Sequence, residues 1–126
     1  MKTKKFVLAI IIVLLGIGNV KANNSEEQQK VYIRVLLFTW QDSLSVDTKA
    51  EFLDLFKGLP EKVDGFIGCS VNDIEWSKDG YQTVLVLKLT GNDAVKAYEE
   101  HDDHKKILEI GPTIVKDFSM YNYWEE

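Results

Sequence analysis

The segment VYIRVLLFTW, residues 31–40, decides the fold of this chain. It is rich in β-branched and aromatic residues, which favours a β-strand. Strict alternation then places on one strand face Tyr32, Arg34, Leu36, Phe38 and Trp40. A single cation therefore interrupts an otherwise apolar face. Because the other face of the segment is apolar as well, we expect a sheet that is covered on both sides.

Three more strands and two helices are predicted after this segment. Apolar residues at helical spacing indicate a helix that begins at Ser45 or Asp47 and ends at Gly58 and Pro60. Strands are expected over residues 65–76 and 81–90, joined as a hairpin by the turn at 77–80. A second helix, capped by Asn92 or Asp93, should stop at Gly111 and Pro112, and a last strand should cover residues 114–124. This β-α-β-β-α-β order predicts an α+β, ferredoxin-like fold with an antiparallel sheet.

The uncovered face of that sheet needs a partner, because both helices pack on the opposite face. A second copy of the same chain is the simplest partner, since a two-fold contact lets one apolar patch serve both subunits. We therefore expect a homodimer in the form of a dimeric α/β barrel.

The first 22 residues have the layout of a secretory signal peptide. A cationic start at residues 1–5 precedes the apolar run 6–17, and Val20 and Ala22 place small residues where a signal peptidase cuts. Twelve apolar residues span only about 18 Å as a helix, short of a hydrocarbon core of roughly 30 Å. We expect no stable membrane insertion after cleavage, a secreted or periplasmic protein, a flexible lead-in at 23–30, and a single domain at 31–126.

The charge balance and the cysteine content narrow the possible partners. The formal charge of the whole chain is -5, and four lysines but no acidic residue lie in the first 22 residues. The remainder holds 11 basic and 20 acidic residues and so carries -9. Such a domain repels nucleic acid and anionic lipid, which leaves a small molecule or another protein as the partner. Cys69, the only cysteine, cannot form an intramolecular disulfide and is interpreted as a small buried hydrophobe rather than a nucleophile.

The densest polar cluster is His101-Asp102-Asp103-His104, which contains both histidines of the chain. Two imidazoles at i and i+3 with carboxylates between them have the composition of a metal site. A histidine beside an acid is also suited to general-base catalysis near neutral pH. The plain alternative is a solvated helix end, where histidine and lysine meet the helix dipole. The sequence leaves these three interpretations open.

Four motifs make the chain resemble the stress-responsive A/B barrel (Dabb) domain family of the dimeric α/β barrel superfamily, over roughly residues 32–124. They are the opening strand RVLLFTW at 34–40, the Gly-Tyr pair at 80–81, the helix-end motif YEEHDDH at 98–104, and Asp117 in the last strand. The helix-end motif is the most specific, and it resembles the family's Tyr-x-x-His-Pro-x-His with Asp102 in place of the proline.

The resemblance implies a small homodimer with a cavity between the helices and the sheet, and no cofactor. A plant member of the family closes a polyketide ring by an aldol-type reaction, in which a histidine of the helix-end motif acts as base and a tyrosine of that motif and a histidine of the first strand assist. Carried over by motif, His104 corresponds to the catalytic base and Tyr98 to the assisting tyrosine. Arg34 stands where the family has a strand histidine, and a guanidinium cannot accept a proton.

Two roles are open for Arg34. It can bind an anionic ligand or an enolate beside His104, or it can form an internal ion pair with Asp117 or Glu75. Asp117 could equally hydrogen-bond His104. The predicted ligand-binding set is Arg34, Phe38, Trp40, His101 and Asp117, with no metal ligand.

Two functions follow from these assignments. The first is binding of a small apolar or anionic molecule in a cavity. The alternative is a cofactor-independent lyase or cyclase that uses His104 as general base.

Overall fold

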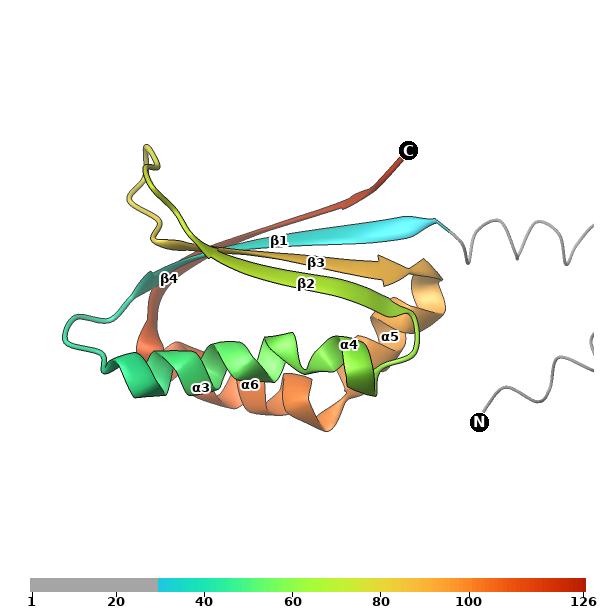
Figure 1. Ribbon diagram of the computed structural model, residues 1–126, viewed down its shortest axis with the longest axis horizontal. Coiled ribbons are helices and arrows are strands. Elements are labelled where there is room, and N and C mark those ends of the chain that lie inside the picture. The colour runs from blue at the N-terminus through green and yellow to red at the C-terminus, as the bar shows by residue number, and fades with distance from the viewer. Residues whose placement is uncertain (1–29) are drawn as a thin grey trace, which may run out of the picture.

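The computed structural model describes residues 30–126; the predicted signal peptide and residues 23–29 of the lead-in lie outside this range. Within it, four strands form one antiparallel sheet and four helices form a second layer (Figure 1). The strands are β1 (Val31–Trp40), β2 (Phe66–Asp73), β3 (Thr83–Thr90) and β4 (Val115–Trp124). Their order across the sheet, β2-β3-β1-β4, confirms the predicted ferredoxin-like α+β fold.

All four helices cover the same face of the sheet (Figure 1). They are α3 (Val46–Lys57), α4 (Leu59–Lys62), α5 (Gly91–Glu100) and α6 (Asp102–Ile114). Helix α3 begins where predicted, because the Ser45 hydroxyl accepts a hydrogen bond from the Thr48 backbone amide. The core between the two layers includes Phe38, Phe52, Phe56, Leu59, Leu85 and Leu87.

The register of the central strand confirms the predicted face of β1. Arg34 lies opposite Leu87 on β3 and opposite Asn122 on β4. Two residues along, Leu36 lies between Leu85 and Met120. Because side chains alternate along a strand, this row points towards the helices, and Arg34 enters the interior among apolar neighbours.

The predicted second helix is wrong in two respects. The segment is split at His101, whose extended backbone (φ -71°, ψ 146°) separates α5 from α6. The Gly111-Pro112 pair does not stop α6, which runs on to Ile114. Pro112 lies in the last turn, where a missing backbone donor costs a single intrahelical hydrogen bond.

Smaller differences concern the first helix and the hairpin. Pro60 does not end helical structure but lies in the first turn of the short helix α4, a position where proline is tolerated. Strands β2 and β3 are shorter than the predicted ranges, and the chain bends away from the ladder between residues 74 and 82. The hairpin itself is as predicted.

Gly65 brings α5 close to the start of β2. Its φ of +83° lies in the left-handed region, and a Cβ there would approach the Ala94 Cβ to 2.7 Å. Only glycine therefore allows α5 to lie this close to the sheet. This close approach positions Tyr98, which is one turn further along α5.

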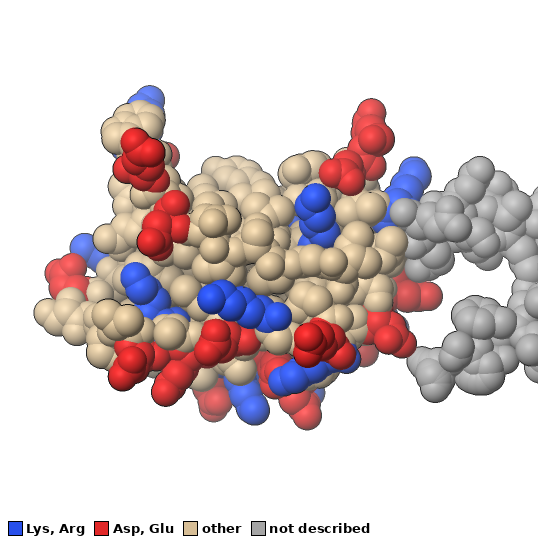
Figure 2. Space-filling view, viewed as in Figure 1, with Lys and Arg blue, Asp and Glu red and all other residues tan. Residues whose placement is uncertain are grey.

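The centre of the sheet face opposite the helices is apolar. In the register it carries Val35 beside Val86 and Tyr121, with Leu37 beside Val84. Tyr121 and Tyr123 are exposed in the single chain. Figure 2 shows this face in profile, with few charged side chains between the hairpin tip and the C-terminal end, whereas acidic and basic side chains gather along the helix layer.

Candidate functional site

A cavity of about 500 Å³ lies between α3, α6 and the inner face of β1 and β4. Most of its wall is apolar and comes from Leu36, Phe38, Phe52, Phe56, Ile107, Leu108, Val115, Phe118 and Met120. The polar side chains in the wall are those of Arg34, Tyr98, His104 and Lys116. The lining therefore contains two cations and no carboxylate. Leu108, Phe118 and Met120 are exposed, so the cavity opens along the free edge of β4.

Arg34 is buried at one end of this cavity and is held by polar and aromatic partners. Its Nε donates to Asn122 Oδ1 at 2.8 Å, and its Nη2 lies 3.4 Å from Glu99 Oε2. The guanidinium carbon lies 5.6 Å from the ring centre of Tyr98 and 5.9 Å from that of Tyr32. Burial acts to lower the pKa of Arg34, but the two tyrosines outweigh it and the pKa is raised, so the side chain stays charged.

The internal ion pair of Arg34 exists, but both predicted partners were wrong. Glu75 lies near the β2–β3 hairpin, and Asp117 is an exposed residue of β4 that pairs in register with Thr39. Glu99 from α5 takes the place of both. Sequence alone missed it because Glu99 meets Arg34 only through the packing of α5 against the sheet, which the apolar spacing does not show.

Tyr98 and His104 are brought together at the same end of the cavity. Their ring centres lie 4.7 Å apart, and Tyr98 also packs edge-on against Phe66 at 5.4 Å. The Tyr98 side chain is buried, which raises the pKa of its hydroxyl above the ordinary value. It is therefore a neutral hydrogen-bond donor at neutral pH.

The contact of His104 with the backbone determines its tautomer. Its Nδ1 lies 3.0 Å from the Glu99 carbonyl oxygen, which can only accept. Nδ1 must therefore carry the proton in the neutral ring, and Nε2 is left as the basic nitrogen. Burial lowers the pKa of the imidazole below its usual value, so this neutral form predominates at pH 7.

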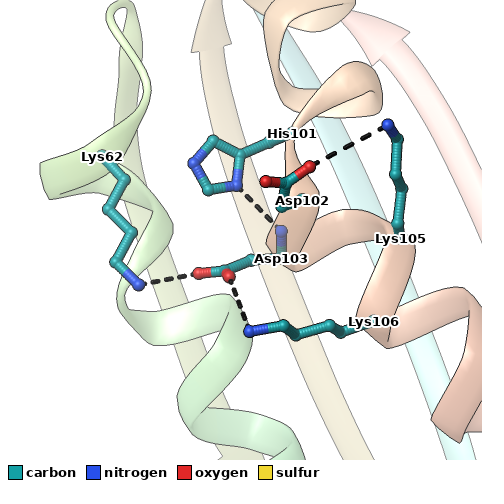
Figure 3. Close-up of polar contacts among 6 residues, drawn as sticks. All are labelled: Lys62, His101, Asp102, Asp103, Lys105 and Lys106. Atoms are coloured by element: carbon teal, nitrogen blue, oxygen red, sulfur yellow. Dashed lines mark hydrogen bonds and ion pairs between the residues drawn. The ribbon is translucent and has the colours of Figure 1, made fainter.

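His101 has a different role from His104. Its Nδ1 accepts a hydrogen bond of 2.9 Å from the Asp103 backbone amide, and the residue caps α6 (Figure 3). It borders a separate surface depression beside Asp93 and does not line the cavity. In residues 30–126, no three histidine, cysteine or acidic side chains gather in a way that could hold a metal ion.

Asp103 ties α6 to α4. The buried carboxylate accepts a hydrogen bond of 2.7 Å from Lys62 Nζ and lies 3.8 Å from Lys106 Nζ (Figure 3). The hydrogen bond from Lys62 holds the pKa of Asp103 below its usual range. The polar cluster therefore holds two helices together on one side and delivers His104 to the cavity on the other.

The remaining predicted site residues divide between the cavity and other places. Phe38 lines the cavity, whereas Trp40 is buried beside it, donates from Nε1 to Thr83 Oγ1 at 2.9 Å, and borders a depression at the hairpin. Asp117 is not part of the cavity wall. Burial raises the pKa of the Cys69 thiol to about 11, which makes it a poor nucleophile at neutral pH.

The sequence analysis missed three polar residues at the site, Glu99, Lys116 and Asn122, as well as most of the apolar cavity wall. Asn122 faces Arg34 only because β1 and β4 pair in one particular register. Lys116 follows the end of α6 and adds a second cation to the cavity wall. Its neighbour Val115 lies opposite Trp40. The register of β1 and β4 shifts between Thr39 and Trp40, which changes the direction of the first side chains of β4.

Residues 33–125 match the family model described as the stress-responsive A/B barrel domain, Dabb. The chain belongs to the Dabb family. No curated protein matches the sequence. Among solved structures, a dimeric ferredoxin-like protein of unknown function from Thermobifida fusca is 22% identical, with a TM-score of 0.65; the similarity covers 76% of this chain and 92% of that one.

Two further solved structures show the range of similarity. A Dabb family protein from Mesorhizobium loti is 18% identical with a TM-score of 0.64, covering 75% of this chain and 96% of that one. A hydroxynitrile lyase from Passiflora edulis has a TM-score of 0.70 at 7% identity, covering 78% and 95%. At these identities the likeness establishes the fold alone.

None of the helices in residues 30–126 of this Dabb protein is long and apolar enough to span a membrane.

We predict that Asp103→Asn destabilises the Dabb domain by about 1–3 kcal/mol at pH 7, because a charge-assisted hydrogen bond to Lys62 is lost. Since the pKa of Asp103 is lower in the folded state than in the unfolded state, its stabilisation is complete above about pH 4. It is lost as the pH falls through the folded-state value. Urea unfolding at pH 7 and at acidic pH measures both effects.

The matched control is Asp102→Asn, because the Asp102 side chain is 87% exposed and lies 3.9 Å from Lys105. We expect this change to alter the free energy of unfolding by less than about 0.5 kcal/mol. Equal losses in the two variants would contradict a structural role that is specific to Asp103.

Proposed function

We propose that this Dabb protein is an exported binding barrel that holds a small apolar molecule bearing an anionic group. The observation that carries the proposal is the composition of the cavity wall: mostly apolar side chains, with Arg34 and Lys116 as its charged groups. A volume of about 500 Å³ suits a small organic molecule. The export signal at residues 1–22 remains part of the proposal.

The chemistry of Arg34 supports an anion at the inner end of the cavity. Its planar guanidinium presents five donors, and the two contacts to Asn122 and Glu99 involve Nε and Nη2. Removing this cation from water is costly, and an incoming carboxylate or sulfonate would offset that cost. The Tyr98 hydroxyl, buried beside the guanidinium, can donate to the same anion.

A pair of fluorescent dyes tests this proposal. 8-Anilinonaphthalene-1-sulfonate is anionic, and N-phenyl-1-naphthylamine has the same ring skeleton without the sulfonate. We predict that Arg34→Leu raises the Kd of the anionic dye about tenfold, because a charge-assisted contact is lost, and leaves the uncharged dye unaffected. Fluorescence titration of both dyes provides the measurement.

Arg34→Lys serves as the control, because it keeps the charge and removes the planar fork. It should retain most of the affinity for the anionic dye. Equal binding of the anionic dye by Arg34→Leu and by the unmodified protein would remove the proposal of an anion site at Arg34.

A second candidate function is proton transfer by His104. Its support is the hydrogen bond between Nδ1 and the Glu99 carbonyl, which leaves Nε2 basic, and the position of the ring in the cavity wall. An apolar ketone bound in the cavity could lose an α-proton to Nε2. Tyr98 and Arg34 would then stabilise the resulting enolate as hydrogen-bond donor and cation.

We predict that the protein exchanges the methyl protons of acetophenone in D2O and that His104→Ala slows this exchange at least about 100-fold without unfolding the domain. Because the pKa of His104 is lowered, the unmodified protein should keep its rate down to below pH 6.5 and lose it as the imidazole is protonated. Proton NMR follows the exchange. His101→Ala, which removes a helix cap outside the cavity, should retain the rate; an equal loss in both variants would contradict the assignment.

We also propose that two copies associate through the apolar sheet face around Val86. The Thermobifida fusca protein, described as dimeric and ferredoxin-like, supports a dimer by analogy of fold, and the apolar centre of the sheet face is the reason for choosing this face. A charged side chain introduced at the centre of such an interface would have no partner there and would have to lose its hydration. A homodimer would bury the face that the helices leave uncovered.

We predict that Val86→Glu converts the protein from dimer to monomer, as measured by sedimentation equilibrium. Val46→Glu is the control, because Val46 is 77% exposed on α3 in the opposite layer. Circular dichroism checks that both variants fold. A Val86→Glu protein that sediments as an undiminished dimer would place the interface elsewhere.

A further inference from the structure

Glu99 contacts both functional groups at the inner end of the cavity, through two different atoms. Its backbone carbonyl accepts from His104 Nδ1 at 3.0 Å, and its carboxylate lies 3.4 Å from Arg34 Nη2. The Glu99 side chain is 47% exposed, whereas that of Arg34 is 10% exposed. Glu99 does not line the cavity. The half-exposed carboxylate of Glu99 thus neutralises the buried guanidinium of Arg34, which lines the cavity.

The contact between the two charges is weak by its geometry. Charge-assisted hydrogen bonds of this kind are normally about 2.7–2.9 Å long, well below the 3.4 Å observed. A half-exposed carboxylate keeps much of its hydration, so its pair with Arg34 is easily exchanged. The neutral Asn122 makes the shorter contact, at 2.8 Å.

Arg34 does not need Glu99 to keep its position. The bond from Nε to Asn122 fixes one edge of the guanidinium, and the rings of Tyr98 and Tyr32 lie within 6 Å of its centre. Removal of the Glu99 charge therefore changes the electrostatic balance at Arg34 and leaves its side chain in place. The backbone carbonyl that orients His104 is the same for any side chain at position 99.

We propose that Glu99 is the resident counterion of Arg34 and that the anionic group of a ligand replaces it. Glu99 then determines how strongly the cavity selects anions over uncharged molecules of the same shape, since each ligand must compete with it for the guanidinium. The inference rests on the proposed function, binding of an apolar anion in the cavity, and adds the residue that controls its charge selectivity.

Glu99→Gln tests this role, because it removes the charge and keeps the size and the backbone. We expect the Kd of 8-anilinonaphthalene-1-sulfonate to fall by roughly two- to fivefold, the range expected for loss of a competing, partly exposed ion pair. The Kd of N-phenyl-1-naphthylamine should not change. In an Arg34→Leu background, Glu99→Gln should have no effect on either dye.

Glu100→Gln is the matched control, since Glu100 is the exposed neighbour on α5 and the change in net charge is the same. It should leave both dyes unaffected. Weaker binding of the anionic dye by Glu99→Gln would show that Glu99 positions Arg34 and would overturn the proposal, as would an equal gain in Glu100→Gln. Failure of the unmodified protein to bind either dye would overturn the proposed function, whereas binding that is insensitive to Glu99→Gln would overturn only the counterion role.

Discussion

The pairing of β1 with β3 on one side and with β4 on the other is the constraint on which the rest of the molecule depends. It places the row from Tyr32 to Trp40 beneath the helices and brings Asn122 opposite Arg34. A shift of one residue in either register would turn these side chains to the other face of the sheet. The same pairing creates the apolar wall of the cavity and the apolar outer face.

A buried arginine on this central strand then organises the polar side of the site. A cation in an apolar interior is costly unless partners compensate it. The compensation comes from three elements: an amide on β4, a carboxylate on α5 and aromatic rings on β1 and α5. Because the carboxylate contact, at 3.4 Å, is longer than the amide contact, at 2.8 Å, and the Glu99 side chain is 47% exposed, it is the contact that we propose a ligand replaces. In this proposal, the side chain of Arg34 contributes both to the packing of the interior and to the selection of a ligand.

The helix break at His101 separates two histidines that the motif places only three residues apart. His101 Nδ1 accepts a hydrogen bond from the Asp103 amide, and this residue lies outside the cavity. His104, in the first turn of α6, hydrogen-bonds the Glu99 carbonyl through its Nδ1 and lines the cavity. The carboxylate of Asp103, which lies between them in the sequence, forms an ion pair with Lys62 on α4. A cluster that has the composition of a metal site is therefore divided into a cap, an anchor between helices and a cavity residue.

The sequence by itself determined the order of strands and helices, the inward face of β1 and the presence of a lone cation on it, because these follow from local periodicity and composition. It also indicated Tyr98 and His104 through a motif of fixed spacing. Only the tertiary structure decided that Glu99 and Asn122 surround Arg34, that Asp117 and His101 stay outside the cavity, and that α6 continues through Pro112. These outcomes depend on the register between strands that are distant in sequence and on the direction of α5, neither of which is encoded in the spacing of neighbouring residues.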